Sequence, residues 1–119
     1  MDNIIDNFLK FQVQTRILHW QTKSYARHKA YDQFYDSLSS LIDKFIEVHM
    51  GKYGRVKTGG SIELKNMSEF QIKDFLSEMD QFLISLSKKY DPRKDSDILN
   101  IRDEMLGSVN QLRYLLTLE

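Results

Sequence analysis

The sequence has 119 residues, with 17 Lys plus Arg balanced by 17 Asp plus Glu. This length allows one hydrophobic core and excludes two full domains, so a single domain over residues 1–119 is expected. The zero formal net charge argues against nucleic acid or an anionic membrane as the main partner. Cysteine is absent, which excludes disulfides, thiolate metal sites and thiol catalysis and leaves nitrogen and oxygen as metal ligands.

The composition predicts helices and no membrane-spanning segment. Proline occurs once and β-branched residues are not clustered, a pattern that favours helices over strands. No stretch approaches the roughly 18 apolar residues that cross a membrane. The opening MDNIIDNFLK has acidic side chains and no long apolar run, so we expect no signal peptide and a cytoplasmic location, in a cell or in a phage host.

Two helices are predicted in the first half of the chain. The first begins near Asp2, a suitable N-cap, and extends to about Thr22. After a tight connection over residues 24–27, the second covers about residues 28–50, and Gly51 is expected to end it. Its predicted core stripe, at alternating steps of three and four residues, is Tyr31, Phe34, Leu38, Leu41, Phe45 and Val48. The face expected to suit a partner chain carries Tyr35, Ile42 and Ile46.

A long segment without helical period separates this pair of helices from the next. Residues 52–67 reach about 50 Å when extended at about 3.3 Å per residue, enough to cross the length of a bundle. Ser68 with Gln71 is predicted to form a capping box for the third helix. Met67 with Ile72 is predicted to form the accompanying hydrophobic staple.

The third helix is predicted to extend to about Lys89, where Asp91-Pro92 stops it, and Asp95 or Ser96 is predicted to cap the fourth. Connections that are short, long and then short predict an all-α, ferritin-like four-helix bundle. In this fold one long crossover joins the second and third helices. A simple up-and-down bundle would not need the long middle segment.

Four residues of the second helix form two pairs, each one helical turn apart: His28 with Asp32, and Asp43 with Glu47. At about 100° per residue, all four point into an arc about 100° wide. The pairs lie about 22 Å apart at about 1.5 Å per residue, too far to share a metal ion within one chain. A second copy packed antiparallel would set each pair against the other, with His19 as a fifth ligand. The sequence therefore predicts two metal sites at a homodimer interface.

Imidazole nitrogen and carboxylate oxygen together suit iron, manganese or zinc, and such a set can leave a coordination position open for redox or hydrolytic chemistry. Taken singly, carboxylates on an exposed helix face are usually solvated. The joint spacing favours a metal site, because one two-fold operation satisfies every pair at once. The third histidine, His49, has no partner at helical spacing and is expected at a helix end or an interface.

The run LHWQTKSYARHKAYDQFYDSLSSLIDKFIE resembles the signature of the Dps family, ferritin-like proteins that protect DNA in starved bacteria. That family has His-Trp near the end of its first helix, His-x-x-x-Asp opening the second, and Asp-x-x-x-Glu further along it. The same order occurs here in His19, Trp20, His28, Asp32, Asp43 and Glu47. The resemblance implies an inter-subunit ferroxidase site that binds iron(II) and oxidises it, typically with peroxide.

The chain also departs from the Dps pattern. The interval between His19 and His28 is shorter than in the family, and both a basic tail and a small helix in the crossover are missing. DNA binding is therefore expected to be weak or absent. A dimer is better supported than the family's large cage. Similar minimal versions occur among bacteriophage proteins, which would suit this compact form.

These residues support three hypotheses. The leading one is a ferritin-like protein that binds, and as a ferroxidase oxidises, iron(II) at a dimer interface. Manganese or zinc could occupy the same ligands. The second is a structural or adaptor four-helix dimer that has lost metal chemistry. The third, a divalent-metal hydrolase with the same ligands, ranks last because the sequence has no phosphate-binding loop or basic pocket.

Overall fold

The computed structural model describes residues 3–119, and in that range it contains four α-helices and two short 3-10 turns. The helices are α1 (Ile4–Gln21), α2 (Tyr25–Tyr53), α3 (Ile72–Ser85) and α4 (Ser96–Leu115). Turn η1 (Met67–Glu69) precedes α3, and turn η2 (Leu86–Lys88) follows it. The prediction of an all-α protein with four packed helices is confirmed.

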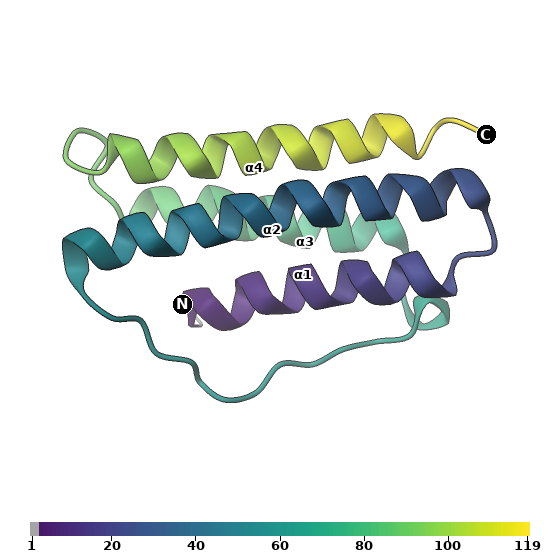
Figure 1. The fold of residues 1–119 in the computed structure, drawn as a ribbon, viewed down its shortest axis with the longest axis horizontal. Coiled ribbons are helices and arrows are strands. Elements are labelled where there is room, and N and C mark those ends of the chain that lie inside the picture. Colours follow the sequence, from purple (N-terminus) through teal and green to yellow (C-terminus); the bar gives the residue numbers. More distant parts are fainter. Residues whose placement is uncertain (1–2) are drawn as a thin grey trace.

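The helices lie side by side along the long axis of the molecule (Figure 1). α1 and α4 run in one direction and α2 and α3 in the other, so each short connection joins antiparallel helices (Figure 1). α2 packs against both α1 and α4, and α3 packs against α4. The extended segment between α2 and η1 returns along the length of the bundle beside α1 (Figure 1), as predicted for the crossover.

Both ends of α2 differ from the prediction. Ser24 is its N-cap, because the Ser24 hydroxyl accepts a hydrogen bond from the backbone N–H of Arg27 at 3.2 Å, and the helix begins earlier, at Tyr25. The expected stop at Gly51 is wrong: the helix continues to a cap at Gly54, where φ is 87°. Glycine adopts this conformation without a steric penalty. Inside a helix glycine costs only about 1 kcal/mol, which the rest of a long, packed helix offsets.

The caps of α1 and α4 are close to those predicted. The predicted cap Asp2 lies outside the described residues, and Asn3 is the N-cap of α1, accepting a hydrogen bond from the backbone N–H of Asp6 at 3.2 Å. Asp95 is the N-cap residue of α4, as predicted, although its carboxylate makes no capping bond to that helix.

The predicted capping box of Ser68 and Gln71 is wrong. The Glu69 carboxylate instead accepts a hydrogen bond from the backbone N–H of Asn66 at 2.6 Å. The capping box is therefore formed by Asn66 and Glu69, and it belongs to turn η1. α3 begins afterwards, at Ile72, and its N-cap Gln71 makes no side-chain capping bond. The local pattern of a polar residue followed three positions later by Glu or Gln occurs twice here in overlapping register, and sequence alone does not choose between the two.

Aromatic side chains of α1 form the centre of the core. The Phe8 ring lies 5.0 Å from that of Phe45 in α2 and 5.3 Å from that of Phe82 in α3, edge to face in both cases. The Phe11 ring lies 5.6 Å from Phe82 and 5.9 Å from Phe75. Such pairs contribute about 0.5–1.5 kcal/mol each beyond the burial of their area. They join α1, α2 and α3 through one cluster.

α2 buries a wider arc than the predicted stripe. The buried members of that stripe are Tyr31, Phe34, Leu38 and Phe45, whereas Leu41 and Val48 are half-buried. Ile42 was expected to face a partner chain, but it is 3% exposed and belongs to the core. The reason is that α2 lies between α1 and α4, so contacts on two sides widen its buried face. Tyr35 and Ile46 are half-buried at the edge of this face.

Polar side chains of α1 hold the crossover against the bundle. The buried Gln14 amide donates to the Lys65 carbonyl and accepts from the Lys65 backbone N–H, both at 2.9 Å. Nearer the start of α1, the Asp6 carboxylate accepts from the backbone N–H of Gly59 at 2.7 Å. A Cβ atom at Gly59 would lie 2.5 Å from that carboxylate, so glycine permits this close approach.

Replacing Gln14 with alanine is expected to destabilise the protein by about 1–2 kcal/mol, because the two hydrogen bonds between the buried amide and the Lys65 backbone are lost. Urea unfolding followed by circular dichroism measures this loss. Gln21→Ala is the matched control: Gln21 also accepts from the crossover, at the Met67 N–H at 2.7 Å, but it is exposed. Water can replace the exposed bond, so its loss should be clearly smaller. Equal losses would contradict the role given to the buried amide.

Candidate metal site between α1 and α2

Two predicted ligands, His19 near the end of α1 and His28 in the first turns of α2, stack against each other. Their ring centroids are 3.8 Å apart, with 19° between the ring planes. The Nδ1 atom of each ring lies 2.8 Å from the backbone carbonyl oxygen of the other residue. A carbonyl oxygen can only accept, so each Nδ1 carries the hydrogen and donates it. In the neutral ring this leaves Nε2 with a free lone pair, the arrangement found in metal-binding histidines.

Asp32, one turn after His28, brings a carboxylate to the same place. Its Oδ1 atom lies 4.0 Å from His19 Nε2, too far for a hydrogen bond. For zinc, a metal–nitrogen and a metal–oxygen bond together measure about 4.0–4.3 Å. At the present separation an ion would lie almost in line between the two atoms, and an inward movement of the carboxylate would give the bent angle of a tetrahedral site. His19 is 8% exposed and the Asp32 side chain 45% exposed, so the site opens to solvent beside Asp32.

Arg16 of α1, which was not among the predicted ligands, contacts the same carboxylate. Its Nη1 donates to Asp32 Oδ1 at 2.8 Å, and this hydrogen bond is the main reason why the pKa of the Asp32 carboxyl lies below its usual value. The guanidinium lies over the rings of Tyr35 and Trp20, 4.7 Å and 5.9 Å from their centroids. Helical spacing was the available signal, because Arg16 precedes His19 by three residues and so shares its side of α1.

The other two predicted ligands, Asp43 and Glu47, are exposed on α2. Each lies fifteen residues after its counterpart in the first pair, which is about 22 Å at about 1.5 Å per residue. Within residues 3–119, no three His, Asp or Glu side chains converge closely enough to hold a metal ion. One chain therefore supplies two separate groups of predicted ligands, and their union by a second chain stays a prediction.

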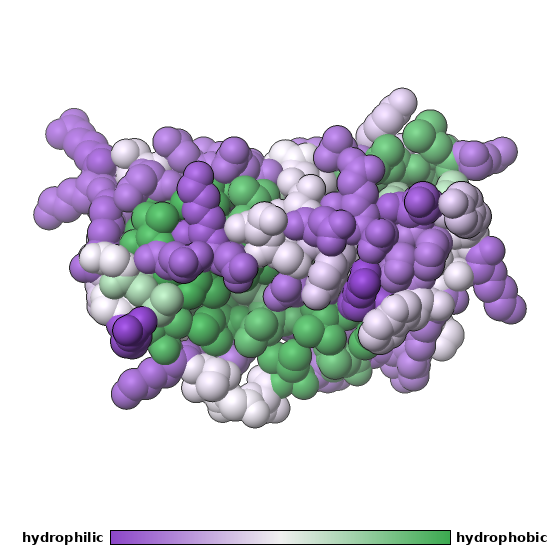
Figure 2. Space-filling view, viewed as in Figure 1, coloured by the Kyte–Doolittle hydropathy of each residue, from purple (hydrophilic) through white to green (hydrophobic). Residues whose placement is uncertain are grey.

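An exposed apolar row on α1 lies beside this site. Leu9, Val13 and Trp20 are 39%, 36% and 69% exposed, and their spacing places them along one side of the helix. Figure 2 shows hydrophobic side chains gathered in a band over α1. Next to this row, the Gln12 amide of α1 donates to the Ser39 hydroxyl of α2 at 2.8 Å. From the sequence, partner-facing residues are expected on the second helix only.

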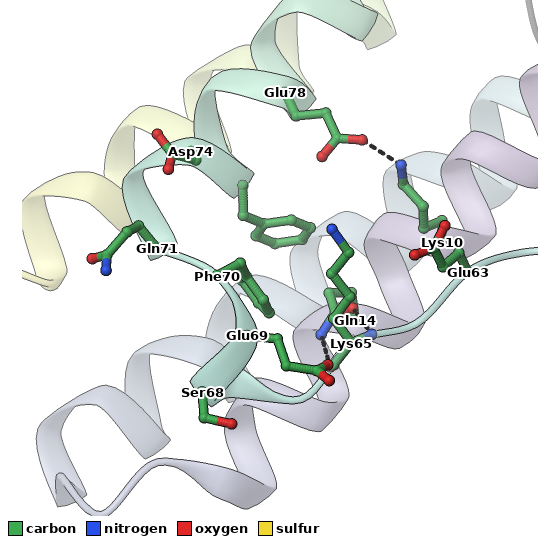
Figure 3. A pocket seen from close by; sticks show the side chains of 11 residues that line it. Lys10, Gln14, Glu63, Lys65, Ser68, Glu69, Phe70, Gln71, Asp74 and Glu78 are labelled. Atoms are coloured by element: carbon green, nitrogen blue, oxygen red, sulfur yellow. Dashed lines mark hydrogen bonds and ion pairs between the residues drawn. The ribbon is translucent and has the colours of Figure 1, made fainter.

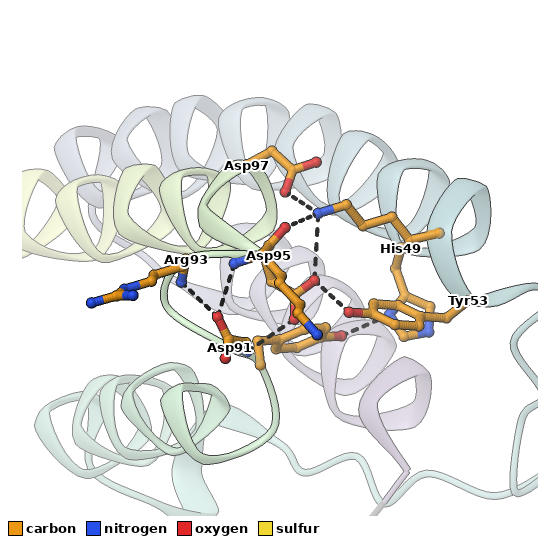
Figure 4. Close-up of polar contacts among 9 residues, drawn as sticks. His49, Tyr53, Asp91, Arg93, Asp95 and Asp97 are labelled. Atoms are coloured by element: carbon orange, nitrogen blue, oxygen red, sulfur yellow. Dashed lines mark hydrogen bonds and ion pairs between the residues drawn. The ribbon is translucent and has the colours of Figure 1, made fainter.

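Near the other end of α2, His49 is hydrogen bonded within the chain (Figure 4). The Tyr90 hydroxyl lies 2.8 Å from His49 Nδ1. Burial raises the pKa of Tyr90 to about 12, so this hydroxyl keeps its hydrogen and donates it. Burial also lowers the pKa of His49, which the nearby Asp95 carboxylate opposes. His49 thus fastens α2 to the connection that precedes α4.

Asp95 is the central charge of this second cluster (Figure 4). It is 3% exposed, and its carboxylate accepts hydrogen bonds from the Tyr53 hydroxyl, from the backbone N–H of Asp91 at 2.9 Å and from the Lys52 ammonium at 3.4 Å. These donors, the Tyr53 hydroxyl foremost, lower the pKa of the Asp95 carboxyl. One carboxylate therefore ties the end of α2 to the start of α4.

The lowered pKa of Asp95 predicts a pH-dependent contribution to stability. Its stabilisation is complete above the unfolded-state pKa of about 3.9 and is lost as the pH falls through the lower, folded-state value. Urea midpoints measured from about pH 6 to pH 3 should therefore fall more steeply for the wild type than for Asp95→Asn. Glu104→Gln, which removes an exposed carboxylate, should keep the wild-type slope. A parallel fall for wild type and Asp95→Asn would contradict this role.

A hollow of about 650 Å³ lies between α1, the crossover and α3 (Figure 3). Phe70 and Phe75 form an aromatic wall, with ring centroids 5.9 Å apart. Lys10 of α1 pairs with Glu78 of α3 across its edge (Figure 3). The described residues that line this hollow include none of the five predicted ligands, so it is separate from the candidate metal site.

Comparison with known proteins gives a family but no activity. Residues 19–116 match a family of unknown function, DUF5856. The chain belongs to this family. The matched range starts at His19 and includes all five predicted ligands.

The chain is similar to a protein of Enterobacteria phage T4. That relative is named as an uncharacterized 14.6 kDa protein in the mobD-ri intergenic region, and it is 36% identical over 118 residues, which cover 99% of this chain and 88% of the relative. No solved structure matched. These matches carry no Dps or ferritin name, so that resemblance stays a prediction. In residues 3–119, no helix has both the length and the apolar content needed to cross a membrane.

Proposed function

We propose that this DUF5856 chain is a ferritin-like protein that forms a homodimer and binds iron(II) between its subunits. One subunit would contribute His19, His28 and Asp32 to each site. The second copy would contribute Asp43 and Glu47. Manganese or zinc would suit the same nitrogen and oxygen ligands.

The reciprocal hydrogen bonds of the histidine pair are the observation that carries this proposal. Packing alone would stack two rings without fixing which nitrogen keeps its hydrogen. Here each Nδ1 donates its hydrogen to the backbone carbonyl oxygen of the other histidine, with 2.8 Å between nitrogen and oxygen. Both Nε2 atoms are thereby reserved as acceptors, with one of them 4.0 Å from the Asp32 carboxylate. In metal-binding histidines, a backbone carbonyl commonly accepts the hydrogen of the ring nitrogen that does not bind the metal.

The helix directions support the ferritin-like part of the proposal. Two antiparallel pairs, α1 with α2 and α3 with α4, are joined by a crossover that returns along the bundle (Figure 1). Bundles of this connectivity place metal ligands on facing helices. Here the predicted ligands lie on the α1–α2 pair.

Iron(II) would be the substrate at this site. Each Fe²⁺ gives up one electron, and hydrogen peroxide takes up two electrons and two protons to form two waters. The protein side chains would hold the ions and leave a coordination position open, which is what metal-centred redox chemistry needs. The half-exposed Asp32 side gives a route from solvent.

A dimer is the first requirement of this function. Light scattering at micromolar concentration should give twice the chain mass of 14.1 kDa. Val13→Glu should shift the protein toward monomer, because it puts a charge into the exposed apolar row of α1. Ile84→Glu is the matched control, since Ile84 is an exposed apolar residue of α3. A wild-type protein that is only monomeric would overturn the shared-site proposal.

Subunit mixing tests the site itself. His28→Ala and Glu47→Ala should each lose anaerobic iron(II) binding without unfolding, because neither side chain belongs to the core. In a heterodimer of the two variants, isolated with two affinity tags, both lesions fall in one site and the other site is intact. Iron binding should then return to about half of the wild-type stoichiometry. Heterodimers that stay inactive would show that the site is not shared in this way.

A structural or adaptor dimer is the second candidate. The ion pair between Arg16 and Asp32 favours it, because it satisfies the carboxylate without any metal. If the protein has this structural function, the wild type should be dimeric and should bind no iron(II), manganese(II) or zinc(II) in the same titrations.

A further inference from the structure

The Asp32 carboxylate has two competing partners, and one of them is already in place. The oxygen Oδ1 that lies 4.0 Å from His19 Nε2 is the same atom that accepts a hydrogen bond from Arg16 Nη1 at 2.8 Å. A metal ion bound between His19 and Asp32 would therefore meet the guanidinium at its own ligand atom. Two cations at that oxygen repel each other, and the guanidinium cannot release its charge by losing a proton.

Arg16 is held in this position by more than the ion pair. Its guanidinium lies 4.7 Å from the Tyr35 ring centroid and 5.9 Å from the Trp20 ring centroid. Cation–π contacts of this kind attract the guanidinium to the ring faces. The Arg16 side chain is 33% exposed, so it can move outward without breaking the core.

We infer that Arg16 is a placeholder cation, which occupies the metal half-site when it is empty and must leave Asp32 before a metal ion binds. The inference rests on the proposed metal-binding function and adds a residue that sets the affinity and selectivity of the site. A metal ion has to offset the lost Arg16–Asp32 pair. Ions that also bind imidazole gain His19 and His28 in return, whereas Mg²⁺ and Ca²⁺ prefer oxygen ligands and gain little.

Trp20 gives a direct readout of this displacement. It is the only tryptophan of the chain, and its indole is one of the rings under the guanidinium. Departure of Arg16 should change the emission of Trp20. With Zn²⁺, which has a filled d shell and no redox chemistry, the signal reports the departure of Arg16 and not quenching by the ion.

The test is anaerobic titration of the wild-type dimer and of Arg16→Gln with Fe²⁺ and, separately, Zn²⁺. Calorimetry follows both titrations, and Trp20 fluorescence is recorded with Zn²⁺, because this filled-shell ion does not itself quench tryptophan. Arg16→Gln should bind both metals about tenfold more tightly, because a repelling charge and a competing ion pair are removed. Its fluorescence without metal should resemble that of the zinc-loaded wild type. Mg²⁺ should bind detectably only to Arg16→Gln.

Two further variants keep the test decisive. Lys23→Gln removes an exposed positive charge from the same end of the bundle and should change metal affinity less than about twofold, as expected for a screened surface charge. Arg16→Lys keeps the charge but loses the planar guanidinium, so its affinity should lie between those of the wild type and Arg16→Gln. Circular dichroism checks that each variant is folded.

The possible results separate the inference from the function on which it rests. Equal or weaker metal binding by a folded Arg16→Gln, with a wild type that does bind, overturns the placeholder role and leaves the proposed function intact. If Arg16→Gln binds metal and the wild type does not, the inference is supported, because Arg16 then keeps metal ions out of the wild-type site. Absence of binding to the wild type and to every variant overturns the proposed function, and the inference falls with it.

Discussion

The packing of α2 between α1 and α4 is the interaction on which the rest of the structure depends. α2 covers Tyr25–Tyr53, about 43 Å at about 1.5 Å per residue, and the longest dimension of the molecule is 43 Å. One straight helix therefore carries the His28 pair near one end and the Asp43 pair toward the other. Since the two pairs lie about 22 Å apart on this one continuous helix, only a second molecule could bring them together.

α1 connects the core, the crossover and the candidate site. Its Phe8 and Phe11 rings join three helices, and its Gln14 amide holds the crossover at Lys65. Its remaining side carries an exposed apolar row and Arg16. A helix with only one apolar stripe would pack against the core and would have no second apolar surface for a partner. The additional apolar row, with Trp20 69% exposed, is why α1 as well as α2 belongs in any account of a partner surface.

At the candidate site, the balance of charge decides between the metal-binding and the structural function. The histidine pair is arranged with both Nε2 atoms free to act as ligands, because the backbone carbonyls hold the other ring nitrogens. The carboxylate of Asp32, in contrast, is already neutralised by Arg16. A divalent ion brings more charge than a guanidinium and can bind nitrogen as well as oxygen. The same group of side chains can therefore form a closed ion pair or an open metal site.

The sequence by itself determined the four helices, the long crossover and the spacing of His28, Asp32, Asp43 and Glu47 along one helix, because periodicity and helical rise are local properties. Only the tertiary structure decided that Ile42 is buried and that Arg16 reaches Asp32. These outcomes depend on the rotation and axial register of α1 against α2, which local spacing does not fix. The stacking of His19 on His28 could likewise not be predicted from the sequence, since it depends on how the last turn of α1 packs against the first turns of α2.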